Sequence, residues 1–230
     1  MHVVTGASAG IGRAIAVELA SRGEEVTAVA RSAGLLEDLA RRHGGIHPLP
    51  VDLSTEAGRL LLVETLGPGA VKSLVHGAAS HVPAVPYTEI DAARLVEDFR
   101  IHVAAGVALT GRVLTERGLE QAVFIDSYSA TTARPGWAAY SILKAAGQMA
   151  AVALEQEHPE LTVLRLFPGA VRTGLLEAVL ASDPSPAREV YRTLDAEGSV
   201  AETSDIGRWA VDTILGPALV SGEVHYRPGE

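Results

Sequence analysis

The chain has 230 residues, of which 47% are hydrophobic and 20% charged, and it contains no cysteine. These values predict one globular domain with a buried core, and they exclude a disordered chain, disulfide bonds and thiolate chemistry. The formal net charge of −9 disfavours a nucleic-acid partner, because phosphate backbones are bound by clustered Lys and Arg. No apolar stretch reaches about 20 residues without a charge, and the first strand begins at His2. We therefore expect a cytoplasmic protein with neither a membrane span nor a signal peptide.

Apolar segments of strand length alternate with segments of helical period along the chain. This alternation is typical of repeated strand–helix–strand units. It predicts a single α/β domain over 1–230, with a doubly wound parallel sheet of about seven strands and helices on both faces. The expected strands are 2–5, 25–30, 46–51, 71–76, 122–126, 161–167 and 224–226. The expected helices are 11–21, 35–42, 55–66, 89–117 (one long helix or two joined ones), 138–157 and 205–215.

A glycine-rich segment, Thr5-Gly6-Ala7-Ser8-Ala9-Gly10-Ile11-Gly12, separates the first strand from the first helix. In an open parallel sheet, ligands bind beyond the carboxyl ends of the strands, and glycines let the backbone approach a pyrophosphate. The free N–H groups at the start of the following helix suit an anion. An ordinary strand–helix turn is the alternative, because three glycines alone are weak evidence. The position after the first strand favours a dinucleotide site made of Gly6, Ser8, Ala9, Gly10, Ile11 and Gly12.

The end of the second strand, Val29-Ala30-Arg31-Ser32, carries no carboxylate. An acid at this point would bind the adenine ribose 2′-hydroxyl, whereas an Arg suits a 2′-phosphate. Arg31 can pair with that phosphate through its planar guanidinium, and Ser8 and Ser32 can add hydroxyl donors. A solvated Arg at a strand end is the alternative. We expect NADP(H) rather than NAD(H).

Tyr140 and Lys144 lie four residues apart on the helix expected after the fifth strand, so they share one face of it. A free Tyr has a pKa near ~10, too high for a good proton shuttle at neutral pH. A nearby ammonium lowers that pKa, and we expect Lys144 to supply it. Ser127, at the end of the fifth strand, is placed to hold a substrate oxygen. A surface pair on a helix is the alternative, because Tyr-x3-Lys alone is common.

Five motifs, in order along nearly the whole chain, resemble those of the short-chain dehydrogenase/reductase family. They are Thr5-Gly6-x3-Gly10-x-Gly12, Asp52-Leu53, Ser127 thirteen residues before Tyr140, Tyr140-x3-Lys144, and the segment Pro168-Gly169-Ala170-Val171-Arg172-Thr173. The resemblance implies a Rossmann fold and hydride transfer between a nicotinamide and a carbonyl carbon. It also implies that Tyr140 donates the proton, Lys144 binds the nicotinamide ribose and Ser127 orients the carbonyl. It also implies cofactor contacts from Asp52, Leu53, Gly77, Ala78, Ala79, Tyr140, Lys144, Pro168, Gly169, Val171 and Thr173.

The resemblance further implies a homodimer or homotetramer built on the two long helices. A face of small residues on the helix 138–157 would pack either on a partner or on the protein's own sheet. Its members are Ala145, Ala146, Met149, Ala150 and Ala153.

Two histidines depart from the family pattern. His76-Gly77-Ala78-Ala79 stands where the family has Asn-Asn-Ala-Gly, so the Asn hydrogen bonds cannot be assumed. His102 occupies the apparent position of an Asn that helps to hold a water in the family's proton relay. A neutral imidazole donates and accepts hydrogen bonds and titrates near neutral pH, so His102 either replaces that Asn as a catalytic residue or packs without a role. The two do not predict a metal site, because no third ligand of matching spacing accompanies them.

The family covers its substrate with the region after the Pro-Gly segment, here 173–203. Leu175, Leu176, Val179 and Leu180 have helical spacing and form either an apolar lid or a helix core. Residues 182–186 should be a hinge or loop. We expect an NADPH-dependent reductase of the carbonyl reductase type, acting on a small, fairly apolar carbonyl or alcohol. A non-catalytic NADP(H)-binding sensor or scaffold that kept the fold is the alternative.

Overall fold

The computed structural model describes residues 1–182, 184–217 and 220–228. In this part of the chain, seven strands form one parallel sheet in the order β3-β2-β1-β4-β5-β6-β7. The order reverses between β1 and β4, which is where open α/β sheets form a ligand crevice. The strands are β1 (His2–Thr5), β2 (Val26–Ala30), β3 (Ile46–Pro50), β4 (Ser73–His76), β5 (Gln121–Ile125), β6 (Thr162–Phe167) and β7 (Gly222–His225).

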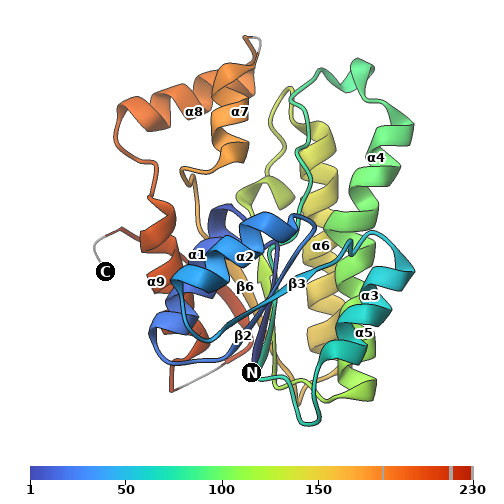
Figure 1. Ribbon diagram of the computed structural model, residues 1–230. Helices are drawn as coiled ribbons and strands as arrows, with labels where there is room; N and C mark the ends of the chain where they lie inside the picture. Colours follow the sequence, from blue (N-terminus) through green and yellow to red (C-terminus); the bar gives the residue numbers. More distant parts are fainter. Residues whose placement is uncertain (183, 218–219, 229–230) are drawn as a thin grey trace.

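Helices cover both faces of the sheet, which confirms the doubly wound fold (Figure 1). One face carries α1 (Gly10–Ser21), α2 (Ala33–Arg42) and α9 (Thr203–Ile214). The other carries α3 (Glu56–Thr65), α4 (Ala92–Phe99), α5 (Ala105–Glu116) and α6 (Ala138–Glu157). Except for α4, these helices pack apolar residues on apolar strand faces, so the two main cores lie on opposite sides of the sheet, whereas α4 packs against α6. No helix in the described ranges combines the length and the apolar character needed to cross a bilayer.

The helix expected over 89–117 is nearly continuous but changes its pitch in the middle. After a short 3₁₀ turn, η1 (Tyr87–Glu89), α4 runs into one π-helical turn, η2 (Arg100–Ala104), and then into α5. A π turn holds an extra residue and is often found at functional sites. It carries His102 to the edge of the ligand crevice.

The region expected to be the lid contains two helices, α7 (Gly174–Ala181) and α8 (Pro186–Ala196). The sequence does not predict α8, because this region is polar and contains Pro. Its start has a recognisable cap, since the Ser185 hydroxyl accepts a hydrogen bond from the Arg188 N–H and Pro186 occupies the first turn. The expected hinge over 182–186 is therefore confined to the residues before Pro186, and Asp183 lies outside the described residues.

The two ends of the lid meet at its base. Val171 and Ala201 form an isolated parallel bridge. The Arg172 N–H donates to the Ala201 carbonyl at 2.9 Å, and the Ala201 N–H donates to the Ala170 carbonyl at 2.9 Å. The Arg172 guanidinium also pairs with Asp195 at 2.6 Å and with Glu202 at 3.0 Å. The chain therefore leaves and rejoins the body of the protein at one place.

Candidate active site

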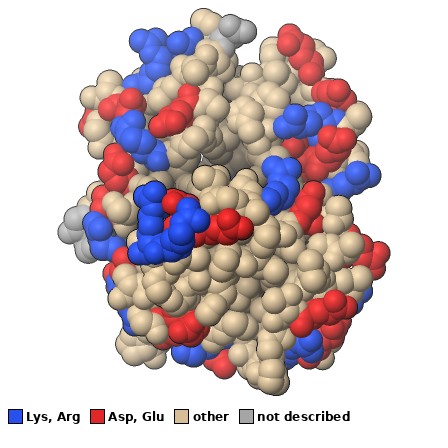
Figure 2. Space-filling view, in the orientation of Figure 1, with Lys and Arg blue, Asp and Glu red and all other residues tan. Residues whose placement is uncertain are grey.

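A cavity of about 500 Å³ lies at the carboxyl ends of β1, β4 and β5. Figure 2 shows a hollow near the middle of one face of the molecule, with mostly uncharged residues at its rim. A second cavity of about 90 Å³ shares Tyr140, Lys144 and Thr173 with it. The predicted cofactor residues that line the larger cavity are Gly6, Ser8, Ala9, Gly10, Ile11, Gly12, Leu53, Gly77, Ala78, Ala79, Tyr140, Lys144 and Thr173. Ser127, Pro168, Gly169 and Val171 line the smaller one.

The glycine loop is shaped for a close backbone approach. Gly6 and Gly10 have positive φ angles of 69° and 57°, which L side chains rarely adopt. A Cβ on Gly12 would lie 2.6 Å from the Gly6 carbonyl oxygen. Ala9, the N-cap residue of α1, has no side chain to cap the helix, so first-turn N–H groups are left for an anion. The loop therefore fits the pyrophosphate of a dinucleotide.

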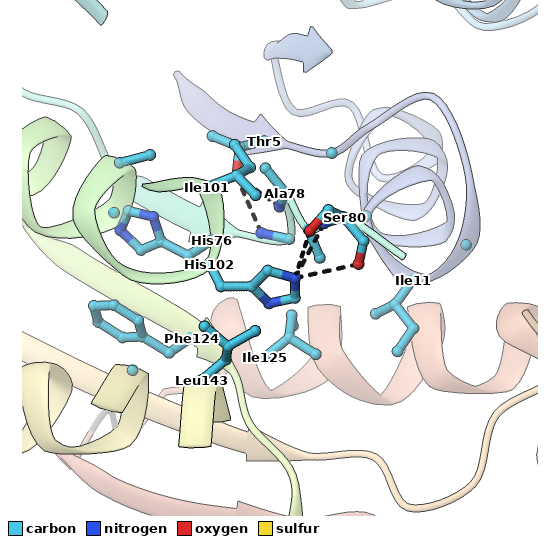
Figure 3. Close-up of a pocket in the computed structure, with 18 of the residues that line it drawn as sticks. Thr5, Ile11, His76, Ala78, Ser80, Ile101, His102, Phe124, Ile125 and Leu143 are labelled. Atoms are coloured by element: carbon cyan, nitrogen blue, oxygen red, sulfur yellow. Dashed lines mark hydrogen bonds between the residues drawn. The ribbon is translucent and has the colours of Figure 1, made fainter. Parts of the chain in front are cut away.

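The Thr5 side chain joins this loop to the one after β4. Its hydroxyl donates to the Val75 carbonyl at 3.0 Å and accepts from the N–H groups of Gly77 and Ala78 at 3.1 and 3.2 Å (Figure 3). One hydroxyl thus fixes the two backbone segments that border the crevice.

Arg31, Ser32 and Asp52 line neither cavity. They follow the carboxyl ends of the paired strands β2 and β3. Hydrogen bonds from Ser54 lower the pKa of Asp52, and the charge of Arg31 lowers it further. Arg31 is exposed, and Ser32 begins α2 without using its hydroxyl as a cap. Both polar groups are therefore accessible at the strand end where the sequence places the adenine ribose.

Tyr140, Lys144 and Ser127 lie together, as predicted. The Tyr140 ring is buried and stacks on Trp137 with centroids 4.5 Å apart. Lys144 Nζ lies 5.8 Å from the centroid of the Tyr140 ring and donates to the Ile125 carbonyl at 2.7 Å. Tyr140 and Lys144 extend from consecutive turns of α6 toward the end of β5, which supplies Ser127.

The expected lowering of the Tyr140 pKa is not found. Burial raises the pKa of Tyr140 to about 12, against a smaller lowering by the hydrogen bond with Ser127. Burial also lowers the pKa of Lys144, because an ammonium is less stable away from water. Removal of the phenolate from water therefore has the largest effect on the pKa of Tyr140, and Lys144 is not among the groups that shift it. Tyr140 remains a protonated phenol at neutral pH, which suits donation to a carbonyl oxygen.

Asp126 is a buried acid that the sequence analysis missed. It lines both cavities and accepts hydrogen bonds from the Ser127 N–H at 2.7 Å and from Gln148 Nε2 at 3.1 Å. Burial raises its pKa, and its charge raises that of Tyr140. Its place immediately before Ser127 was the signal that could have identified it.

His76 is part of the cavity wall. Its Nε2 lies 2.9 Å from the Thr110 hydroxyl on α5, and its ring stacks on Phe124 at 4.6 Å. Burial lowers the pKa of His76 to about 4, so the ring is neutral at physiological pH. In place of Asn hydrogen bonds, this position joins β4 to α5 and β5.

His102 lies on η2 with its Nε2 close to Ser80 (Figure 3). The distances from Nε2 to the Ser80 nitrogen, carbonyl oxygen and hydroxyl are 3.1, 3.2 and 3.1 Å. Burial, and then the charge of Lys144, lower the pKa of His102 to about 4. The expectation that this ring titrates near neutral pH is therefore wrong, because burial of His102 away from water disfavours the charged imidazolium.

Ser80 and Asp98 are further residues that the sequence analysis missed. The Ser80 hydroxyl lies 2.5 Å from the Asp98 carboxylate, which Arg94 holds from its other side. Arg94, Asp98 and His102 recur at intervals of four along one helical face, and this spacing was the available signal. Among the described residues, no group of three or more His, Asp or Glu is placed to hold a metal ion.

Trp137 and side chains of the lid line the smaller cavity. Trp137 is buried and meets the Tyr191 ring of α8 edge-on at 5.1 Å. Leu176 and Val179 are buried in the lid, whereas Leu175 lines both cavities. The apolar pattern of α7 therefore has two parts, because Leu176 and Val179 form a helix core and Leu175 faces the crevice. Tyr191 had no signal in the sequence, because α8 was not predicted.

Comparisons with known proteins agree with this geometry. A family model described as short chain dehydrogenase matches residues 1–183. D-erythrulose reductase of Gallus gallus is 30% identical over 210 residues, 89% of this chain and 83% of that protein. Carbonyl reductase (NADPH) 2 of Sus scrofa is 32% identical over 197 residues, 82% of this chain and 78% of that protein. The crystal structure of the KRED1-Pglu enzyme shares the fold, with a TM-score of 0.89 and 23% identity over 97% of this chain and 99% of that one.

Proposed function

This chain belongs to the short-chain dehydrogenase/reductase family and is an oxidoreductase acting on CH–OH or C=O groups, and we propose that it reduces a small, fairly apolar carbonyl compound with NADPH. The meeting of Tyr140, Ser127 and Lys144 beside a glycine-lined crevice carries this proposal. The protonated Tyr140 donates its proton to the carbonyl oxygen, which Ser127 orients. A nicotinamide held in this crevice would supply the hydride.

The residues that would hold the cofactor follow from the shape of the crevice. The glycine loop and the first turn of α1 take the pyrophosphate, and the loop at Gly77 borders the nicotinamide half. Lys144, held by the Ile125 carbonyl, binds the nicotinamide ribose. His102 takes the place of the relay Asn, as a neutral group that holds a water and does not store the proton.

The preference for NADPH rests on Arg31. Its guanidinium is exposed at the end of β2, and no carboxylate stands beside it on that strand to bind a free 2′-hydroxyl. Ser32 offers an uncommitted hydroxyl next to it. The Sus scrofa relative carries NADPH in its name, in keeping with this assignment.

The lid supports a small and fairly apolar substrate. The smaller cavity measures about 90 Å³, and Leu175, Leu176, Trp137 and Tyr191 contribute to its wall. A phosphate or a CoA arm would need cations here, and of the described residues that line this cavity Lys144 alone is a cation, which this proposal assigns to the nicotinamide ribose. D-erythrulose, the substrate in the name of the Gallus gallus relative, marks the small polar end of the range to be tested.

The test follows NADPH and NADH absorbance against ketones, aldehydes, vicinal diketones and small keto-sugars. We expect turnover with NADPH on at least one small carbonyl class. Tyr140→Phe should lose about 10²–10⁴-fold in kcat, the usual contribution of a general acid. Tyr87→Phe is the matched control, because Tyr87 is 74% exposed on η1. Tight cofactor binding without turnover of any carbonyl, or full activity of Tyr140→Phe, would contradict the proposal.

We also propose a homo-oligomer formed through α4, α5 and α6. Val96, Val107 and Met149 are 55%, 54% and 65% exposed, and Ala145, Met149 and Ala153 lie away from the protein's own sheet. Light scattering after gel filtration should report a dimer or tetramer. Val107→Lys with Met149→Lys should give monomers, whereas Leu61→Lys, on exposed α3 surface, should not. A monomeric wild type would contradict this assembly.

A further inference from the structure

We propose that Asp98, acting through the Ser80 hydroxyl, holds His102 as its Nε2–H tautomer and so makes Nδ1 a hydrogen-bond acceptor on the Lys144 side of the cavity. Asp98 would then be a positioning residue, since it touches neither cofactor nor substrate. The catalytic consequence rests on the proposed function, whereas the tautomer itself does not.

The Ser80 hydroxyl has one hydrogen, and the geometry commits it to Asp98. The oxygen–oxygen distance is 2.5 Å, and an ionised carboxylate can only accept. Asp98 is 3% exposed and stays fixed because Arg94 Nε donates to its second oxygen at 3.0 Å. Arg94 is itself anchored by donating to the His81 carbonyl at 2.5 Å. The Ser80 hydroxyl therefore presents lone pairs, not a hydrogen, to His102.

Around His102 Nε2 there are two acceptors and one donor. The carbonyl and hydroxyl oxygens of Ser80, at 3.2 and 3.1 Å, both accept from an Nε2–H. Only the Ser80 backbone N–H, at 3.1 Å, would prefer a bare nitrogen. A single Nε2–H is shared between these two oxygens and gives up the bond from the Ser80 N–H, whereas a bare Nε2 serves that N–H alone; the two oxygens favour the Nε2–H tautomer.

Charge at the two ends of the ring favours the same tautomer. Nε2 faces Ser80 and, behind it, the carboxylate of Asp98. In Figure 3 the other nitrogen lies on the side of Ile125 and Leu143, and the Ile125 carbonyl is where Lys144 Nζ is bound. Asp98 attracts the single ring proton toward Nε2, and the Lys144 ammonium repels a proton on Nδ1. Two other histidines line this cavity: His76 is neutral and adds no net charge, and the His81 carbonyl accepts the hydrogen bond from Arg94.

The consequence is a second acceptor for Lys144. Its ammonium has three N–H groups, and the Ile125 carbonyl takes one. A bare Nδ1 can take another, directly or through one water. The opposite tautomer would point an N–H at the ammonium. Because the pKa of His102 is about 4, the ring contributes as a neutral acceptor and keeps its own proton.

The tautomer can be read from long-range ¹H–¹⁵N spectra of the full chain labelled in histidine, at pH 7 and without cofactor. His102→Asn assigns the signals by their loss. In the wild type we expect a protonated Nε2 and a bare Nδ1. In Asp98→Asn the side-chain amide can donate to Ser80, which frees the hydroxyl hydrogen for Nε2, so the population should move to Nδ1–H. Glu97→Gln, exposed and next to Asp98 on α4, should leave the spectrum unchanged.

Ser80→Ala provides a second variant if Asp98→Asn does not fold. It removes one acceptor and leaves the carbonyl and N–H, so a mixture of tautomers is expected. A wild-type ring protonated on Nδ1, or the same tautomer in all three proteins, would overturn the inference.

Steady-state kinetics distinguish a positioning role of Asp98 from a purely structural one. Asp98→Asn should lower kcat about tenfold, the effect of losing one hydrogen bond to a charged group, while the KM for NADPH stays within about twofold. An equal rise in that KM would instead indicate a disturbed cofactor site. If no carbonyl in the panel is turned over, the proposed function fails, and the spectra still decide the tautomer.

Discussion

Gly12→Ala tests the contact between the glycine loop and α1. The added Cβ would lie 2.6 Å from the Gly6 carbonyl oxygen and 3.0 Å from that of Thr5. Since ordinary contact begins at 3.4 Å, loop and helix must separate by about 0.8 Å. Such overpacking costs about 1–3 kcal/mol, offset by up to ~1 kcal/mol because Ala favours a helix. With the full offset the net loss reaches about 2 kcal/mol, which lowers the Tm of a chain of this size by up to roughly 8 °C.

The same displacement should weaken cofactor binding, because it widens the loop that we propose holds the pyrophosphate. At 100 times its Kd, NADPH stabilises the wild type by about 2.7 kcal/mol. If the Kd of Gly12→Ala rises about 100-fold, the same concentration adds only about 0.4 kcal/mol. Thermal melts with and without NADPH measure both effects in one experiment.

Gly34→Ala is the matched control. Gly34 is exposed on α2, and nothing lies within 4 Å of the Cβ that would be added. We expect it to be stabilised by up to about 1 kcal/mol with an unchanged response to NADPH. Wild-type Tm and wild-type NADPH response in Gly12→Ala would refute the close contact between loop and helix.

Three further predictions concern charge. Arg31→Ala should raise the Kd for NADPH about 10–100-fold and leave the Kd for NADH unchanged. Arg41→Ala is the control, because Arg41 is also exposed. An equal loss of affinity for both cofactors would contradict a contact between Arg31 and the 2′-phosphate. Alcohol oxidation needs the Tyr140 phenolate, and the pKa of Tyr140 is raised to about 12. The steady-state rate of oxidation should therefore rise about tenfold per pH unit from pH 7 to 10, while the rate of carbonyl reduction stays level. An oxidation rate that reaches a plateau below pH 8 would speak against this pKa. The pKa of His76 is about 4 in the folded protein, below its value in the unfolded chain. The free energy of unfolding should therefore fall as the pH drops from 6.5 toward 4, because the unfolded chain takes up a proton on His76 that the folded protein does not. Between pH 7 and 5 this loss is about 2 kcal/mol, and His76→Asn should flatten the fall in Tm over that range.

Most of the fold could be predicted from the sequence because local pattern and tertiary structure agree. Strands of a buried parallel sheet are continuous apolar runs, and the helix over 138–157 has the predicted bounds. The predicted fourth strand begins at Val71, but in the structure Val71 makes only an isolated bridge to Leu119 and the strand begins at Ser73. Side-chain pattern does not show where backbone pairing begins. The missed helix α8 has a capped start that outweighs its polar composition.

The juxtaposition of Tyr140, Lys144 and Ser127 was also predictable, whereas their protonation and the presence of Asp126 beside them were not. Motif spacing places Tyr140, Lys144 and Ser127 together, but it carries no information on how dry their surroundings are. Burial decides the pKa of Tyr140 and of His102, and both expectations that ignored it were wrong. Ser80 meets Asp98 only because a loop after β4 folds over α4, which neither segment indicates by itself.

The bridge between Val171 and Ala201 makes the lid an exchangeable unit. Because the strands before and after it are held in register without help from residues 172–200, this stretch can lengthen, shorten or change composition at little cost to the sheet. If the lid sets the substrate range, new selectivity can be obtained by grafting a different helical pair between these two anchor points. Thr173 lines both cavities and would have to be kept, as would an apolar partner for Trp137 and Tyr140.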